Sequence, residues 1–141
     1  MRTRAQRSQG AELAELAILM PFLGLLILVI CECAAVVATH QVISNAAREG
    51  ARLSSVQGVA VSDVQNEVIA YAAANNLTLT TADISVNQNA LIHIGGNSCS
   101  AASPCLSASQ VTVSYTYALA TAIGSLASVP LAVTVEMRNM Y

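Results

Sequence analysis

A long apolar segment close to the start of the chain limits its fold more than any other feature. Leu16 to Cys31 are sixteen residues without a formal charge, and after Glu32 the apolar run resumes from Cys33 to Ala38. As a helix with a rise of about 1.5 Å per residue, residues 16–38 would span about 34 Å, enough to cross a hydrocarbon core of about 30 Å. Polar residues interrupt every later apolar stretch. The sequence therefore predicts one membrane crossing over residues 16–38.

The charge pattern predicts the orientation of this crossing. Arg2, Arg4 and Arg7 lie in the leader, residues 1–10, which carries no acidic residue. Positive charge stays on the cytoplasmic side of a membrane, so the carboxyl-terminal part is expected outside. A mean hydropathy of +0.58 with only 10% charged residues fits a chain dominated by an anchor. Without the leader, three arginines remain against eight acidic residues, which argues against a nucleic-acid partner.

The membrane helix is expected to continue into the outer part of the chain. Gln41 to Ser55 lacks proline and is rich in residues compatible with a helix, so one long helix is predicted over residues 11–55. Pro21 removes the hydrogen bond to the carbonyl of Ala17 and favours a kink or a local melt. Gly50 weakens a helix by about 1 kcal/mol relative to alanine without ending it. Arg48 and Arg52 are four residues apart and share a helix face.

Residues 56–141 read as one small external domain. After a linker at Gly58, Ser62 and Gln65 have the spacing of a capping box, which predicts a second helix that begins there and ends near Asn75. This helix is amphipathic, because apolar residues recur at helical spacing at Val64, Val68, Tyr71 and Ala72.

The remainder alternates between apolar and polar residues, as half-buried strands do. Turn residues at Gly95 to Asn97 separate the strands, and Ala120 to Ser128 resemble a partly helical crossover ahead of Pro130. The fold class is therefore α+β: a long transmembrane helix that extends into a domain with a second helix and an antiparallel sheet. The alternating positions are Ile84 and Val86, Leu91 to Ile94, Val111 to Leu119, and Leu131 to Met137.

The four cysteines fall into two pairs with different expected roles. Cys99 and Cys105 bracket a short polar segment, and this spacing suits a disulfide loop in an oxidising compartment, with two free thiols as the alternative. Closing so short a loop would stabilise the fold by roughly 2 kcal/mol. Cys31 and Cys33 point to helix faces about 200° apart, so they cannot hold one metal within a single chain and are expected to be small lipid-compatible or packing residues.

No set of residues has the pattern of a catalytic, metal or cofactor site. His93 and His40 lie in different segments, and His93 is expected to be a solvated strand residue. Asp63 and Glu67 are one helical turn apart, yet no nucleophile or phosphate loop accompanies them. The chain is therefore not expected to be an enzyme, to bind a cofactor or to hold a metal.

Two carboxylates in the anchor are more informative, because a carboxylate near hydrocarbon is costly unless it finds a partner or a polar edge. Glu32 lies near the outer boundary, where it either reaches water or takes part in packing. Glu15 lies near the inner boundary, five residues after Gly10.

The segment from Gly10 to Glu15, directly ahead of the apolar run, resembles the prepilin peptidase site of type IV pilin-like proteins. With Pro21, Glu32 and the stretch Asn45 to Arg52, it resembles more narrowly the TadE-like pseudopilins of the tight adherence (Flp pilus) system. The part of that stretch that continues the resemblance outside the membrane is Arg48, Glu49, Gly50 and Arg52.

The resemblance implies a minor pilin or pseudopilin that is cut between Gly10 and Ala11 by a prepilin peptidase. Glu15 would then pair with a free subunit amine and enforce register between packed helices. The implied partners are other pilin subunits, the inner-membrane assembly platform, the peptidase and membrane lipid. The implied location is the bacterial inner membrane, crossed once, or an extracellular pilus.

Two other functions remain open. Val36 to Ala38 could serve as a signal peptidase site, which would make the chain a secreted soluble protein, although the apolar core is longer than the usual 7 to 15 residues of a signal peptide. An uncleaved, single-pass anchor carrying a binding module is the other alternative. The mature first residue would be Ala11 for a pilin, Thr39 for a secreted protein, and Met1 or Arg2 for an uncleaved anchor.

Overall fold

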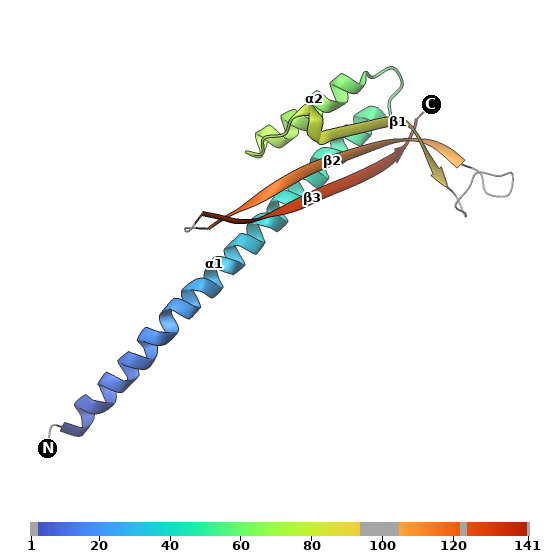
Figure 1. The fold of residues 1–141 in the computed structure, drawn as a ribbon. Coiled ribbons are helices and arrows are strands. Elements are labelled where there is room, and N and C mark those ends of the chain that lie inside the picture. Colours follow the sequence, from blue (N-terminus) through green and yellow to red (C-terminus); the bar gives the residue numbers. More distant parts are fainter. Residues whose placement is uncertain (1–2, 94–104, 122–123, 141) are drawn as a thin grey trace. The chain divides into compact units, whose positions relative to one another are not determined.

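The computed structural model describes residues 3–93, 105–121 and 124–140, with side chains over 13–93, 105–119 and 127–140. It divides into two compact units, one up to Val36 and one from Val37 onwards. The predicted α+β class is confirmed, because two long helices are followed by an antiparallel sheet (Figure 1).

The first helix, α1, runs from Thr3 to Ser54. The long helix is thus confirmed, but it begins in the leader and not near Ala11, because arginine, glutamine and alanine there are good helix formers. The expected local melt at Pro21 is wrong, since α1 is helical on both sides of it and through it. One missing hydrogen bond is tolerated where the neighbouring turns keep theirs.

The second helix, α2, runs from Val61 to Ala74 and buries Val64, Val68 and Ala72. The capping box expected at Ser62 and Gln65 is wrong: Ala60 is the N-cap, and no side chain caps this end. Gln65 instead donates a hydrogen bond of 3.1 Å to the carbonyl of Ile84. Its amide therefore ties α2 to the first strand, a role that local spacing does not reveal.

The sheet contains β1 (Ile84–His93), β2 (Cys105–Thr121) and β3 (Gly124–Arg138) in the order β1-β2-β3. Both pairings are antiparallel, as predicted. β1 pairs with β2 only from Cys105 to Val113, so the rest of β2 and its partner β3 form a two-stranded ribbon. The turn expected at Gly95 to Asn97, with Ile94 before it, lies outside the described residues.

The crossover predicted for Ala120 to Ser128 is wrong, because β2 extends to Thr121, β3 begins at Gly124, and the two strands pair with each other. Ala118 pairs with Ser128, and Thr121 pairs with Gly124. Small residues have weak strand propensity, so pairing with a neighbour decides their conformation. Pro130 lies inside β3 opposite Thr116. An edge strand tolerates proline, since the missing N–H can lie on the unpaired side.

One apolar core joins the carboxyl-terminal part of α1, α2 and one face of the sheet (Figure 1). From α1, only Ile43 among the fully buried residues is large. Small residues let α2 and the sheet approach the helix backbone closely. The buried core residues are Ile43, Ala46, Ala47, Ala51, Val64, Val68, Ala72, Leu77, Leu79, Ile84, Val111 and Val113.

Gly50 lies where α1 and α2 approach each other closely. A Cβ atom added there would lie 2.4 Å from Cγ2 of Val68 and 3.6 Å from Cγ1 of Val111. Any larger side chain would push α2 or β2 away from α1. Gly50 therefore fixes how closely these three elements pack.

We expect Gly50→Ala to destabilise the external domain by roughly 1 to 2 kcal/mol, because overpacking outweighs the gain in helix propensity. Thermal unfolding of the full chain in micelles, followed by tyrosine circular dichroism, measures this. Gly24→Ala is the matched control, since a Cβ atom there meets nothing within 4 Å. Equal unfolding temperatures for both variants would contradict the close approach.

A short 3-10 turn from Thr81 to Asp83 leads into β1. Oδ2 of Asp83 accepts hydrogen bonds from the backbone N–H of Thr80 at 2.8 Å and from its hydroxyl at 2.7 Å. These bonds favour the ionised carboxylate and lower the pKa of Asp83 below its ordinary value of 3.8.

The Asp83 contacts should therefore make stability depend on pH in the acid range. A lowered folded-state pKa adds stability that is fully present above about pH 5 and is lost as the pH falls through the folded pKa. We expect Asp83→Asn to remove this part of the acid dependence and to cost about 1 kcal/mol at neutral pH, the usual value of a cap. Denaturant unfolding as a function of pH measures it. Glu67→Gln, at an exposed position on α2, is the control, and loss of the same acid dependence there would contradict the assignment.

Candidate functional site: the amino-terminal helix

The predicted processing segment lies within α1. Gly10 and Ala11 have helical backbone, and the side chain of Glu15, one and a half turns further on, is exposed. Glycine is the residue that stabilises a helix least apart from proline, so Gly10 is the weakest point of this stretch. A free amine at Ala11 would lie close to Glu15 along the same helix.

The helix after Glu15 exposes its apolar side chains. It is long and apolar enough to cross a membrane, and within the most apolar window none of the residues is buried in the protein. Phe22, for example, is 78% exposed. Water would disfavour such a surface, whereas lipid or neighbouring helices would favour it. The large exposed residues of this stretch are Leu16, Ile18, Leu19, Met20, Phe22, Leu23, Leu25, Leu26, Ile27, Val29, Ile30 and Val37.

Glu32 differs from its exposed neighbours. Its side chain is half-buried, and its Oε2 atom has no hydrogen-bond partner among the described residues. Cys31 and Cys33 on either side of it are exposed free thiols. The two roles expected for Glu32, reaching water and packing, both stay predictions.

Three different roles are found among the four residues that continue the family resemblance beyond the apolar run, which are Arg48, Glu49, Gly50 and Arg52. Gly50 is buried against α2, as described above. Arg52 forms an ion pair with Glu49 one turn earlier, with its Nε atom 3.2 Å from Oε1 of the carboxylate. Arg48 instead donates a long hydrogen bond of 3.4 Å to Oδ1 of Asn45, a neutral acceptor. The shared face predicted for the two arginines therefore contains one paired and one unpaired charge among the described residues.

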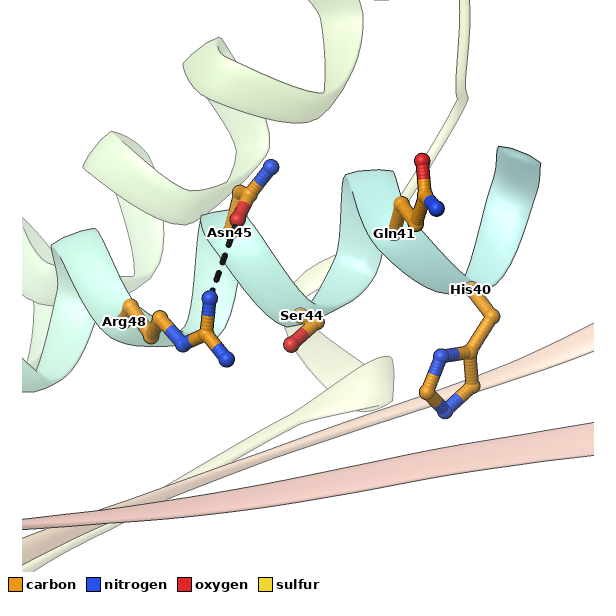
Figure 2. Close-up of a pocket in the computed structure, with 5 residues that line it drawn as sticks. All are labelled: His40, Gln41, Ser44, Asn45 and Arg48. Atoms are coloured by element: carbon orange, nitrogen blue, oxygen red, sulfur yellow. Dashed lines mark hydrogen bonds between the residues drawn. The ribbon is translucent and has the colours of Figure 1, made fainter. Parts of the chain in front are cut away.

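Polar side chains of α1 line an open hollow of about 440 Å³ (Figure 2). All of its lining residues come from this helix, on the turns that also carry the buried residues Ile43, Ala46 and Ala47. The guanidinium of Arg48 extends back along α1 toward Asn45 (Figure 2). The lining residues are His40, Gln41, Ser44, Asn45 and Arg48.

The remaining predicted site residues take no part in this helix. His93 is exposed at the end of β1, with Nδ1 3.3 Å from Sγ of Cys105, a contact that the sequence did not suggest. Cys99 lies outside the described residues, so its bridge to Cys105 stays a prediction. Asp63 and Glu67 are exposed on α2. In the part of the chain that the structure describes, no three His, Cys, Asp or Glu side chains are grouped to hold a metal ion.

One family model matches the chain, and the match coincides with α1. Residues 10–52 match the model of TadE-like proteins. The resemblance stated from the sequence is thereby confirmed over this segment, and it relates the chain to pilin-like proteins associated with the Tad pilus. Comparisons with curated proteins and with solved structures gave no significant match.

The TadE-like segment starts at the predicted processing site and ends two residues before the buried contact between α1 and β2. In that contact the hydroxyl groups of Ser54 and Ser109 are hydrogen-bonded to each other, and both side chains are buried. The bond satisfies two polar groups that water does not reach.

Removal of one of these hydroxyl groups should destabilise the domain nearly as much as removal of both. We expect Ser109→Ala to destabilise the domain by about 1 to 3 kcal/mol, because the hydroxyl of Ser54 then stays buried without a partner. Combining it with Ser54→Ala should add little further loss, which gives a coupling energy of roughly 0.5 kcal/mol or more. Denaturant unfolding of the full chain in micelles measures the double-mutant cycle. Strictly additive losses would contradict the direct hydrogen bond.

Proposed function

We propose that this protein is a minor pilin or pseudopilin that helps to assemble the tight adherence (Flp) pilus and so contributes to surface attachment. Its part is structural, and we assign it no catalysis of its own. The observation that carries this proposal is the position of Gly10 and Glu15 directly ahead of an apolar helix that the folded chain leaves exposed. The TadE-like match over residues 10–52 supports it.

In this proposal the chain has three parts. Residues 1–10 form a cytoplasmic leader, which a prepilin peptidase removes by cutting between Gly10 and Ala11. Residues 11–55 form the helix, with residues 16–38 in the inner membrane, and residues 56–141 form the domain on the outer side. The mature helix then moves laterally from the bilayer into contact with other pilin subunits and with the assembly platform.

Glu15 would pair with the amine of a neighbouring subunit in this assembly. An unpaired carboxylate is costly among packed apolar helices, and a matched positive charge offsets that cost. A shift of one helix along another would separate the two charges. The pair would therefore select one register between subunits.

The first residue of the protein purified from its native membrane separates this proposal from its alternatives. We expect Ala11, measured by mass spectrometry of the intact chain and of its first peptide. Cleavage after Ala38 would also leave the core residues from Ile43 onwards in the domain, so folding alone does not distinguish a secreted form. A first residue of Thr39, or an intact leader, would overturn the proposal.

Glu15→Ala should still insert into the membrane but should reduce the number of pili roughly tenfold or more, because loss of a poorly screened pair costs several kcal/mol. Pili are counted by electron microscopy, and insertion is measured by resistance to alkaline extraction. Glu67→Ala, which removes an exposed carboxylate on α2 and leaves the segment from Gly10 to Glu15 intact, is the control and should assemble normally. Normal piliation in the Glu15 variant would overturn the role of this residue.

A further inference from the structure

We propose that β2 uses the open part of its edge, residues 114–119, to bind an extended strand of a neighbouring pilin subunit. The inference rests on the proposed function and assigns a kind of partner to the outer domain, which that proposal leaves without one. The added strand would lie in line with β1 and run antiparallel to β2.

The edge is open because β2 is longer than the strand beside it. β1 begins opposite Val113, so from Ser114 onwards β2 pairs with β3 alone, and these two strands continue past the start of β1 (Figure 1). Among the described residues, no backbone group outside the sheet is hydrogen-bonded to residues 114–119. The side chains of Ser114, Thr116 and Ala118 are exposed. This side of β2 can therefore accept a further strand.

The position of Pro130 indicates which backbone groups face the open edge. Pro130 lies opposite Thr116, and a proline in an edge strand places its missing N–H on the unpaired side. In an antiparallel ladder, two opposite residues either bond to each other or both point away. The N–H and C=O groups of Thr116 therefore point away from β3 and toward the open edge. Those of Ser114 and Ala118, two residues to either side, do the same.

The other two edges of the sheet carry features that discourage pairing. The register of β1 shifts between Asn87 and Ala90, and β3 contains Pro130, Glu136 and Arg138. Bulges, prolines and charges are the usual means by which proteins protect a strand edge. Residues 114–119 contain no proline and no charge, and their register against β3 is regular. The open edge of β2 thus lacks the protection that the other edges have.

The chemistry of this edge requires an uncharged partner strand. No charged residue occurs from Val111 to Val135, so a charge on the added strand would lose water without gaining a counter-ion. The half-buried side chains of Tyr115, Tyr117 and Leu119 lie on one face of β2, and the small exposed side chains lie on the other. A strand that alternates between apolar and small polar residues matches both faces, while main-chain hydrogen bonds supply the affinity.

The same edge of a second copy does not fit. Ser54 contacts Ser109, and Gly50, one turn earlier, approaches Val111, so α1 and β2 run in opposite directions. Two identical edges pair antiparallel through a two-fold axis, which would also reverse the second α1. Anchors with the same basic leader cross one membrane in the same direction. The strand therefore comes from a different pilin subunit.

Amide exchange along β2 tests the open edge. The full chain in micelles is mixed with a blocked peptide of alternating valine and threonine, and hydrogen exchange is followed by NMR. We expect saturating peptide to slow exchange at Ser114, Thr116 and Ala118 about tenfold, since each of these amides gains a hydrogen bond. Thr116→Pro removes the central N–H but keeps the pairing with β3, so it should lose most of this effect. Thr116→Val, the matched control, keeps the N–H and should respond as wild type.

Piliation tests the source of the strand. In cells, Thr116→Pro should keep Ala11 as its first residue but reduce the number of pili about tenfold, because a subunit contact is lost. Thr116→Val should assemble normally. A wild-type chain that starts at Thr39, or that keeps its leader, would overturn the proposed function and the pilin source of the strand, whereas the peptide measurement tests the edge by itself.

Three results would overturn the edge site. Slow exchange at these amides before the peptide is added would show that the chain covers its own edge. Unchanged exchange in wild type with saturating peptide would show that the edge binds no strand, and this result decides the matter even where the proline variant does not fold. A disulfide between two copies of Thr116→Cys in native membranes would identify a second copy as the occupant.

Discussion

The close approach of α1 to α2 at Gly50 is the constraint on which the external domain depends. One continuous helix has to suit two environments: its first part exposes large aliphatic side chains, whereas its last turns bury small ones. A bulky residue at Gly50 would meet Val68, and the sheet behind it shares the same core. The small residues that end the TadE-like segment are thus explained by packing, while the polar residues beside them remain on the surface.

Much of this fold could be predicted from local patterns, because the patterns and the structure depend on the same physics. The apolar run, the helical spacing of Val64 and Val68 and the alternation around Val111 and Val113 each follow from which face is buried. The wrong predictions concern residues whose burial leaves no clear pattern in the sequence. Ser62 and Gln65 have the right spacing for a cap, but the amide of Gln65 finds a better partner in the carbonyl of Ile84. The residues around Ala120 are small and weakly patterned, so only their pairing with β3 makes them a strand.

In the candidate site, too, some features could be predicted from the sequence and others could not. The spacing of Gly10 and Glu15 is visible in the sequence because it belongs to one linear segment. The sequence does not show that Arg52 is paired and Arg48 is not, since both residues are basic and they are only four positions apart. Glu49 lies three residues before Arg52 and directly after Arg48, and helix geometry lets it face only the former. The contact of Ser54 with Ser109 joins residues far apart in the chain, and no short motif predicts it.

The carboxyl-terminal residues show how the domain would respond to mechanical load. The backbone N–H of Met140 donates to the carbonyl of Ser55 at 3.1 Å, and that of Asn139 donates to the carbonyl of Ser107 at 3.0 Å. The end of the chain is thus fastened beside the last turn of α1, so the first and last segments of the domain hold each other. A force that separates the last turn of α1 from the end of β3 would therefore have to break this closure together with the core that both segments share.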